Sequence, residues 1–506
     1  MRFLPGDPQM LLLLLLAPGL LGMLLWVFAR HCGIAVGLLL ATQVWVVVAG
    51  GQRAAVDLGI SLYPTDILDV CALGVALARV PRWGPRARAA LAALAALLAL
   101  TAWSTLRGAA VFGPQMAGND SRVYFWHFFA VTFYLATAPL NAALIRTVTR
   151  AWLAAAAVYA LCAVARWADR GLYASNAHLA VDGVAVDARP VPAAAALVLA
   201  QAAALLVLTR RARPASRPDP AMSGAPAGAR PAHRWGVGAR HLAALALFAL
   251  VVLLQHRTVW AAGAAMAVTW WLLRPSRGGQ RLVSAGAGVL ALCLAALLYA
   301  VGLFGAAGDA LTASLAETQG TRSTFAWRVL GWQDLLAGPR SLAQWLLGAP
   351  FGSGYERFIG GGLVTVSPHD YYLHVVLRLG LAGLLALLVL YAHTWRRLAG
   401  GGAQTRALCV LLVSQLVLFV SYSAFPEQAV LLGLCLWRAR LQAGAGKRPG
   451  PSAPAEGPAA PAPRAAVHAP RGPRPQILAP PHAKPHEAGR TARRVDLTIS
   501  DKTGEG

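Results

Sequence analysis

His369 is the residue of this sequence best suited to act as a base, because it lies where a long polar stretch returns to an apolar run. An imidazole titrates near about 6.5 and can take a proton from a hydroxyl group at neutral pH. A histidine at the entrance of a helix is also often a structural partner of the helix end, and this reading stays open. Asp370 follows directly, and it either caps the expected helix or orients His369; capping is the favoured reading.

Three arginines that we expect on the same side of the membrane as His369 could hold a phosphate group. Arg257 lies in a tight turn between two apolar runs, Arg322 precedes an amphipathic stretch, and Arg328 follows within that stretch. The planar guanidinium group donates forked hydrogen bonds that match phosphate oxygens. Each arginine also has an ordinary reading: Arg257 as an anchor to lipid phosphate, and the other two as solvated surface side chains.

The polar stretch 304–369 is long for a connection, and such loops are usually either functional or disordered. Between Ser323 and Leu336 its apolar residues recur at helical spacing, which predicts a helix with one apolar face. Trp327 and Trp332 suit a helix that lies at the membrane surface, because indole rings favour the interface. The aromatic residues favour an ordered loop with short helices.

The composition is that of an integral membrane protein. Of the 506 residues, 57% are hydrophobic and only 13% charged, and the mean hydropathy is +0.55. A soluble domain of this size must keep a more polar surface. Repeated apolar runs of about 17–22 residues match a hydrocarbon core of about 30 Å. The sequence therefore predicts an all-α fold, a polytopic bundle of transmembrane helices.

Twelve or thirteen spans are expected, and the third is the weakest because it is short and carries two aspartates. The expected spans are 10–29, 33–50, 65–80, 89–106, 123–139, 147–166, 191–209, 241–255, 258–273, 282–303, 370–393, 406–423 and 425–438.

Orientation follows from clusters of arginine, which mark cytoplasmic loops. The clusters near 79–88, 210–240, 274–281 and 396–406 fall on one side when the spans between them are counted. The loop 304–369 then faces outward, together with Arg257 and the segment 107–122. The side of the N-terminus depends on whether there are twelve or thirteen spans, and both remain open.

These expectations divide the chain into six parts. They are N-terminal spans at 1–210, a basic linker without fixed structure at 211–240, spans at 241–303, the outward loop at 304–369, C-terminal spans at 370–438, and a basic, disordered cytoplasmic tail at 439–506.

The net charge of +25 does not indicate a nucleic-acid-binding protein, because most arginines flank apolar runs and serve as topological anchors. The six cysteines are scattered and form neither a CxxC motif nor a cluster with histidine. We therefore expect no metal site, no disulfide framework and no cofactor.

Taken together, residues 240–440 resemble the O-antigen ligase and O-antigen polymerase superfamily of bacterial envelope glycosyltransferases. The resemblance lies in the order of four segments: Arg257 to Trp260, Arg322 to Trp327, the glycine-rich turn Leu347 to Gly354, and His369 through Gly383. Two positions depart from the family pattern. Asp370 stands where an asparagine is common, and Arg378 stands where an acidic residue is frequent, which puts the substrate in doubt more than the reaction class.

The resemblance implies a metal-independent, inverting glycosyltransferase of the bacterial inner membrane whose active site faces the periplasm. Its donor would be a glycan on undecaprenyl pyrophosphate, and its acceptor a hydroxyl group of lipid A-core. His369 would activate or position the acceptor, and Arg257 and Arg322 would stabilise the leaving pyrophosphate. We expect Arg328, Asp370 and Trp327 to contribute to substrate binding, and membrane lipids to be further partners.

Other functions remain open at this stage. Within the same superfamily, transfer to a growing chain would make the protein an O-antigen or exopolysaccharide polymerase. A membrane transporter would show internal repeats and charges near the middle of its spans, and the sequence offers little of either. A non-catalytic envelope assembly protein would tolerate replacement of His369 by alanine.

Overall fold

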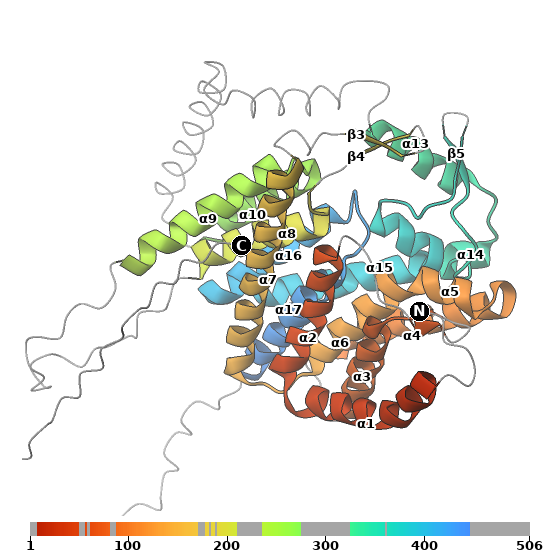
Figure 1. Cartoon of the computed structure of the whole chain (residues 1–506), viewed down its shortest axis with the longest axis horizontal. Helices are drawn as coiled ribbons and strands as arrows, with labels where there is room; N and C mark the ends of the chain where they lie inside the picture. The colour runs from red at the N-terminus through yellow and green to blue at the C-terminus, as the bar shows by residue number, and fades with distance from the viewer. Residues whose placement is uncertain are drawn as a thin grey trace, which may run out of the picture. The chain divides into compact units, whose positions relative to one another are not determined.

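The computed structural model is helical over nearly all of the chain that it describes (Figure 1). The described residues are 8–49, 56–57, 61–80, 88–170, 178–181, 184–187, 190–209, 235–274, 324–359 and 362–445.

The first half of the described chain contains these helices: α1 (Pro8–Arg30), α2 (Cys32–Val48), α3 (Pro64–Arg79), α4 (Arg88–Phe112), α5 (Pro114–Ser121), the π-helix η3 (Arg122–His127), α6 (Phe128–Thr137), α7 (Ala142–Arg170) and α8 (Ala193–Leu208). The second half contains α9 (Trp235–Leu253), α10 (Arg257–Leu273), α13 (Thr324–Ala337), α14 (Leu342–Leu347), α15 (Tyr371–Ala399), α16 (Ala403–Leu418) and α17 (Pro426–Ala445). Three two-stranded antiparallel hairpins join them: β1 (Val56–Asp57) with β2 (Ser61–Leu62), β3 (His178–Val181) with β4 (Val184–Asp187), and β5 (Arg357–Ile359) with β6 (Gly362–Val364).

The described residues are mostly helical, which confirms the all-α expectation for them, and most of the helices coincide with apolar runs of the sequence. The expected span 282–303, most of the linker 211–240 and the tail beyond Ala445 lie outside these residues. Among the described residues, three helical segments, Ala89–Phe112, Ala143–Ala168 and Tyr371–Ala399, are long and apolar enough to cross a membrane by themselves, so the count of twelve or thirteen spans stays a prediction. A fourth crossing results if α1 and α2, which meet at a bend of 118°, form one broken span.

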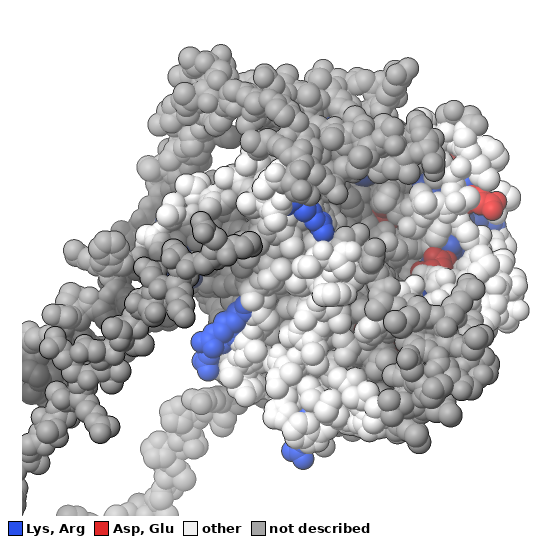
Figure 2. Space-filling model, viewed as in Figure 1, with Lys and Arg blue, Asp and Glu red and all other residues white. Residues whose placement is uncertain are grey.

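The surface agrees with a lipid environment. The face in Figure 2 shows mostly uncharged described residues, with only isolated basic and acidic groups. Large apolar side chains point outward from the helices, among them Leu106, Leu161 and Leu385, which are 67%, 69% and 64% exposed. In water such a surface would be unfavourable, whereas in a bilayer it faces hydrocarbon.

Helices that are far apart in sequence share one apolar core. α17 packs along α6, α15 along α4, and α10 along α16. Buried residues at these contacts, such as Phe128, Leu390 and Trp437, belong to a single hydrophobic cluster. The long helix α15 is thus held by the N-terminal helices, which fixes the position of its first turn.

The segment that the sequence assigns to the outward loop contains the helices α13 and α14 and the hairpin β5–β6. Ser341 caps α14 by accepting a hydrogen bond from the Gln344 backbone N–H, and the Gln344 side-chain oxygen accepts one from the Ser341 backbone N–H. This reciprocal pair is a capping box, which explains why so short a helix forms. β5 packs on α13, and α14 packs on α15 (Figure 1).

α15 is interrupted at Gly380. This residue has φ 68° and ψ −171°, although the residues on both sides are helical. A Cβ atom there would lie 2.2 Å from the backbone oxygen of Leu346, at the end of α14. Gly380 therefore permits both the positive φ and the close approach of α14, which no other residue type could do without strain.

Candidate functional site

His369 lies two residues before α15, and its side chain is partly exposed and partly covered by the surrounding protein. Asp370 is the N-cap of α15, and its carboxylate accepts a hydrogen bond from the Leu373 backbone N–H at 2.9 Å. The expectation that Asp370 caps the helix is thus confirmed. Capping leaves the His369 ring outside the helix and free to point into the surrounding space.

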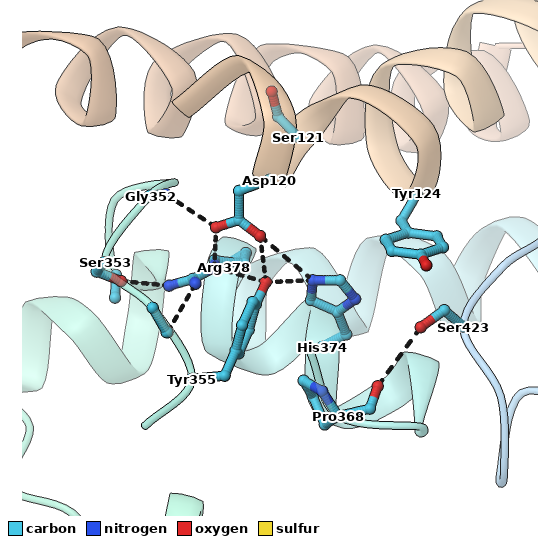
Figure 3. A network of polar contacts seen from close by, with 12 residues as sticks. Asp120, Ser121, Tyr124, Gly352, Ser353, Tyr355, Pro368, His374, Arg378 and Ser423 are labelled. Atoms are coloured by element: carbon cyan, nitrogen blue, oxygen red, sulfur yellow. Dashed lines mark hydrogen bonds and ion pairs between the residues drawn. The ribbon is translucent and has the colours of Figure 1, made fainter. Parts of the chain in front are cut away.

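The turn between α16 and α17 holds this end of α15 in place. The Tyr371 N–H donates to the Phe419 carbonyl at 2.8 Å, and the Ser423 hydroxyl donates to the Pro368 carbonyl at 3.4 Å (Figure 3). The Tyr422 ring lies edge-on to His369, with 6.4 Å between the ring centroids. His369 therefore has a fixed backbone on a rigid support, while its ring remains accessible.

Two arginines of the loop segment lie close to His369. The Arg328 guanidinium stacks over the Tyr422 ring at 5.3 Å from its centroid and donates to the Ser421 carbonyl at 3.3 Å. Arg357 is only 4% exposed, and it donates to the Val366 carbonyl at 2.7 Å. Tyr422 thus contacts both Arg328 and His369.

These surroundings keep His369 neutral. Desolvation by the surrounding protein, together with the positive charges of Arg328 and Arg357, lowers the pKa of His369 to about 4. Burial raises the pKa of Asp370 to about 6, although the hydrogen bonds that its carboxylate accepts from the Leu373 and Tyr372 backbone N–H groups act to lower it. At neutral pH the site thus combines a neutral imidazole with two guanidinium cations, an arrangement that can bind an anion and accept a proton.

A second, buried polar network lies behind the start of α15 (Figure 3). Asp120 at the end of α5 pairs with Arg378, with 2.8 Å between Oδ2 and Nε. The Tyr355 hydroxyl donates to Asp120 Oδ1 at 2.5 Å and accepts from Arg378 Nε at 2.9 Å. It also bonds to His374 Nε2. The hydroxyl proton is used on Asp120, so His374 Nε2 is the donor in this last bond.

This network joins three parts of the chain. Arg378 donates further hydrogen bonds to the Ser353 hydroxyl and to the Gly354 carbonyl, the latter at 2.8 Å. Asp120 also accepts from the Gly352 N–H at 2.9 Å. The glycine-rich turn is thereby fastened to α5 and to α15, and it cannot shift without breaking charged hydrogen bonds.

Electrostatics keep the network in one protonation state. Burial opposes ionisation of Asp120, but the hydrogen bond from His374 and the charge of Arg378 hold its pKa below the usual value. Burial raises the pKa of Tyr355 well above its usual value. Asp120 is therefore an anion that compensates Arg378, and Tyr355 remains a neutral hydroxyl.

The other candidate residues of the sequence are Arg257, Arg322 and Trp327, and the structure does not place them beside His369 in the way that it places Arg328. Arg257 is the first residue of α10, and the neighbouring His256 ring bonds to the Val191 carbonyl at 2.9 Å. The described contacts of His369 do not include Arg257, and Arg322 lies outside the described residues. Trp327 lies on α13 at 37% exposure, and the Arg357 guanidinium lies 5.9 Å from the centroid of its ring.

Sequence reasoning missed Arg357, Tyr422, Asp120 and Tyr355, and it treated Arg378 only as a departure from a family pattern. A signal for the Asp120–Arg378 pair was present. A cation nine residues after His369, within an expected span, requires a partner. Asp120 lies in the segment 107–122, which was expected on the same side. Arg357 and Tyr422 gave no such signal, because their proximity depends on how the loop folds back.

Comparison with known proteins identifies no relative: no protein-family model matches the chain, and no curated protein matches it. Within the described residues, no three histidine, cysteine or acidic side chains gather as metal ligands would.

Proposed function

We propose that this protein is a glycosyltransferase that moves a glycan from a polyprenyl-pyrophosphate donor to an acceptor hydroxyl group. The observation that supports this best is the accessible, neutral His369 beside Arg328 and Arg357, at the head of a helix long and apolar enough to cross a membrane. A lipid-linked donor needs its phosphates bound at the level of the membrane surface, and arginine is well suited to this task.

The proposed reaction is a direct displacement. The acceptor oxygen attacks the anomeric carbon and forms the new C–O bond, while the bond from that carbon to the phosphate oxygen breaks with inversion. The imidazole of His369 takes the proton of the acceptor hydroxyl. Arg328 stabilises the negative charge that develops on the leaving pyrophosphate, and the buried Arg357 contributes through its positive charge without direct contact. Arg257 and Arg322 remain proposed contributors to the same phosphate site on the basis of the family resemblance.

We further propose a ligase that uses lipid A-core as its acceptor at the periplasmic face of the bacterial inner membrane. The alternative within the same chemistry is a polymerase, which would use another repeat unit as acceptor. The residues described here fit both, since each acceptor supplies a sugar hydroxyl.

The test is deletion of the gene, complemented with wild type, His369→Ala or the control His393→Ala, followed by gel analysis of lipopolysaccharide. His393 lies on the same helix, far from Asp370. We expect loss of the ladder in the deletion strain and with His369→Ala, and an intact ladder with His393→Ala. A single-repeat band would indicate a polymerase, and loss of secreted polymer alone an exopolysaccharide enzyme. Full activity of His369→Ala would refute the proposed mechanism.

A further inference from the structure

The hairpin β5–β6 has its polarity reversed relative to a hairpin that faces water. Alternation along β5 buries Arg357 and Ile359, which are 4% and 7% exposed, and turns Phe358 outward at 71% exposure. The buried side packs on α13, where a Cβ atom at Gly331 would lie 2.6 Å from Ile359 and 2.8 Å from Arg357 Nε. The charged residue is thus inside and the aromatic residue outside.

The outward face is apolar on both strands. Phe358 pairs with Leu363 across the hairpin, and Leu363 is 54% exposed. Side chains directly opposite in an antiparallel pair share a face. Val366 follows at 56% exposure, and Leu330 on the supporting helix α13 is also 56% exposed. This concentration of large apolar side chains lies outside the helices that could span the membrane, so the spanning segments do not explain it.

Two observations favour lipid as the occupant of this face. First, α15 begins at Tyr371, eight residues after Leu363, and it is long and apolar enough to cross a bilayer. The hairpin is therefore tethered close to the membrane surface. Second, α13, the helix that supports the hairpin, carries Arg328, and α13 and α14 carry three tryptophans, Trp327, Trp332 and Trp345. Arginine beside phosphate and indole at the interface are typical of protein surfaces at the headgroup level.

We propose that the Phe358–Leu363 face inserts into the bilayer leaflet next to the start of α15. The insertion is shallow: the two side chains enter the hydrocarbon, while the strands stay among the headgroups, because open strand edges cannot lose their hydrogen bonds to water. The inference does not depend on the proposed glycan transfer.

The test uses the full chain in proteoliposomes. An environment-sensitive fluorescent amino acid replaces Phe358 or, in a second variant, Leu363, and its emission is compared in lipids brominated near the headgroup, near the chain end, or not at all. The same probe at Leu385, exposed on α15, marks full lipid contact. At Gln333, an exposed polar position on α13, it marks the aqueous surface.

We expect quenching at 358 and 363 that approaches the level at 385 and exceeds that at 333 several-fold, with the shallow bromines quenching more than the deep ones. Red-shifted, unquenched emission at both positions would place the hairpin in water and overturn the proposal. Blue-shifted emission without quenching, increasing with the ratio of protein to lipid, would also overturn it in favour of contact with a second copy.

Discussion

A histidine surrounded by cations differs from an ordinary histidine in the pH range over which it can act as a base. Arg328 and Arg357 disfavour the imidazolium form of His369, so the ring stays neutral well into the acidic range. The same cations attract an anionic substrate, whose negative charge then offsets theirs. Binding of a pyrophosphate would thus raise the basicity of His369 at the moment when a base is needed.

This electrostatic arrangement predicts an unusual pH profile. With subsaturating donor, the rate of glycan transfer should stay nearly level from pH 7 to about 5 and fall as the pH approaches about 4, because protonation of His369 removes the base. The measurement is transfer in proteoliposomes over this range. Arg328→Gln should shift the acidic limb to higher pH.

Asp370 provides the control for this profile, since burial raises the pKa of its carboxyl group to about 6. In Asp370→Asn the rate should still fall only as the pH approaches about 4, because the pKa of His369 determines this fall. A limb near pH 6 that disappears in Asp370→Asn would show that Asp370 controls the rate. A limb near 6.5 that persists in this variant would show that the two arginines do not act on His369.

At the level of elements, a buried ion pair, together with the hydrogen bonds of its two side chains, fastens α5 and the glycine-rich turn to α15. Arg378 is 2% exposed, and Asp120 is the acidic group that pairs with it. Removal of one partner of a buried pair leaves an uncompensated charge, which costs about 3–5 kcal/mol.

We therefore expect Asp120→Ala to lower the thermal unfolding temperature of the detergent-solubilised protein and to weaken glycan transfer by loosening the support of His369. The double variant Asp120→Ala/Arg378→Met should recover much of the lost stability, because no buried charge remains unpaired. Asn119→Ala, at the exposed neighbouring position, is the control. A double variant whose loss equals the sum of the two single losses would mean that the two side chains do not stabilise one another.

The sequence predicted the helices well, and it predicted their junctions less well, for a physical reason. Apolar periodicity and caps are local, so the runs that became α4 and α15 and the cap at Asp370 could be recognised from residue order alone. The partnership of Asp120 with Arg378 joins residues 258 positions apart (378 minus 120), and no local pattern encodes it. The interruption at Gly380 was not expected from the sequence, because a glycine between apolar residues is equally compatible with close packing of a continuous helix against a neighbour.

For the whole molecule, the sequence predicts one orientation for its loops, and α15 offers a direct check. If α15 crosses the membrane, reporters fused after Gly338 and after Gly401 must lie on opposite sides. We expect alkaline phosphatase activity at the first position and fluorescence of a green fluorescent protein at the second, because Arg396 and Arg397 favour the cytoplasm.

A fusion after Arg274 serves as the control, since its arginine cluster predicts the cytoplasmic side as well. Reporters at 338 and 401 that behave alike would show that α15 does not cross, and the proposed outward position of His369 would then be wrong.

The interruption at Gly380 also determines how deep the polar residues of α15 lie. As one continuous helix, its 29 residues would extend about 43 Å at about 1.5 Å per residue, well beyond a hydrocarbon layer of about 30 Å. The part after Gly380, residues 381–399, extends about 28 Å, which matches that layer closely. If the hydrocarbon boundary coincides with the interruption, His374 and Arg378 belong to the headgroup zone. Arg378 would then lie at a depth where its charge is tolerated.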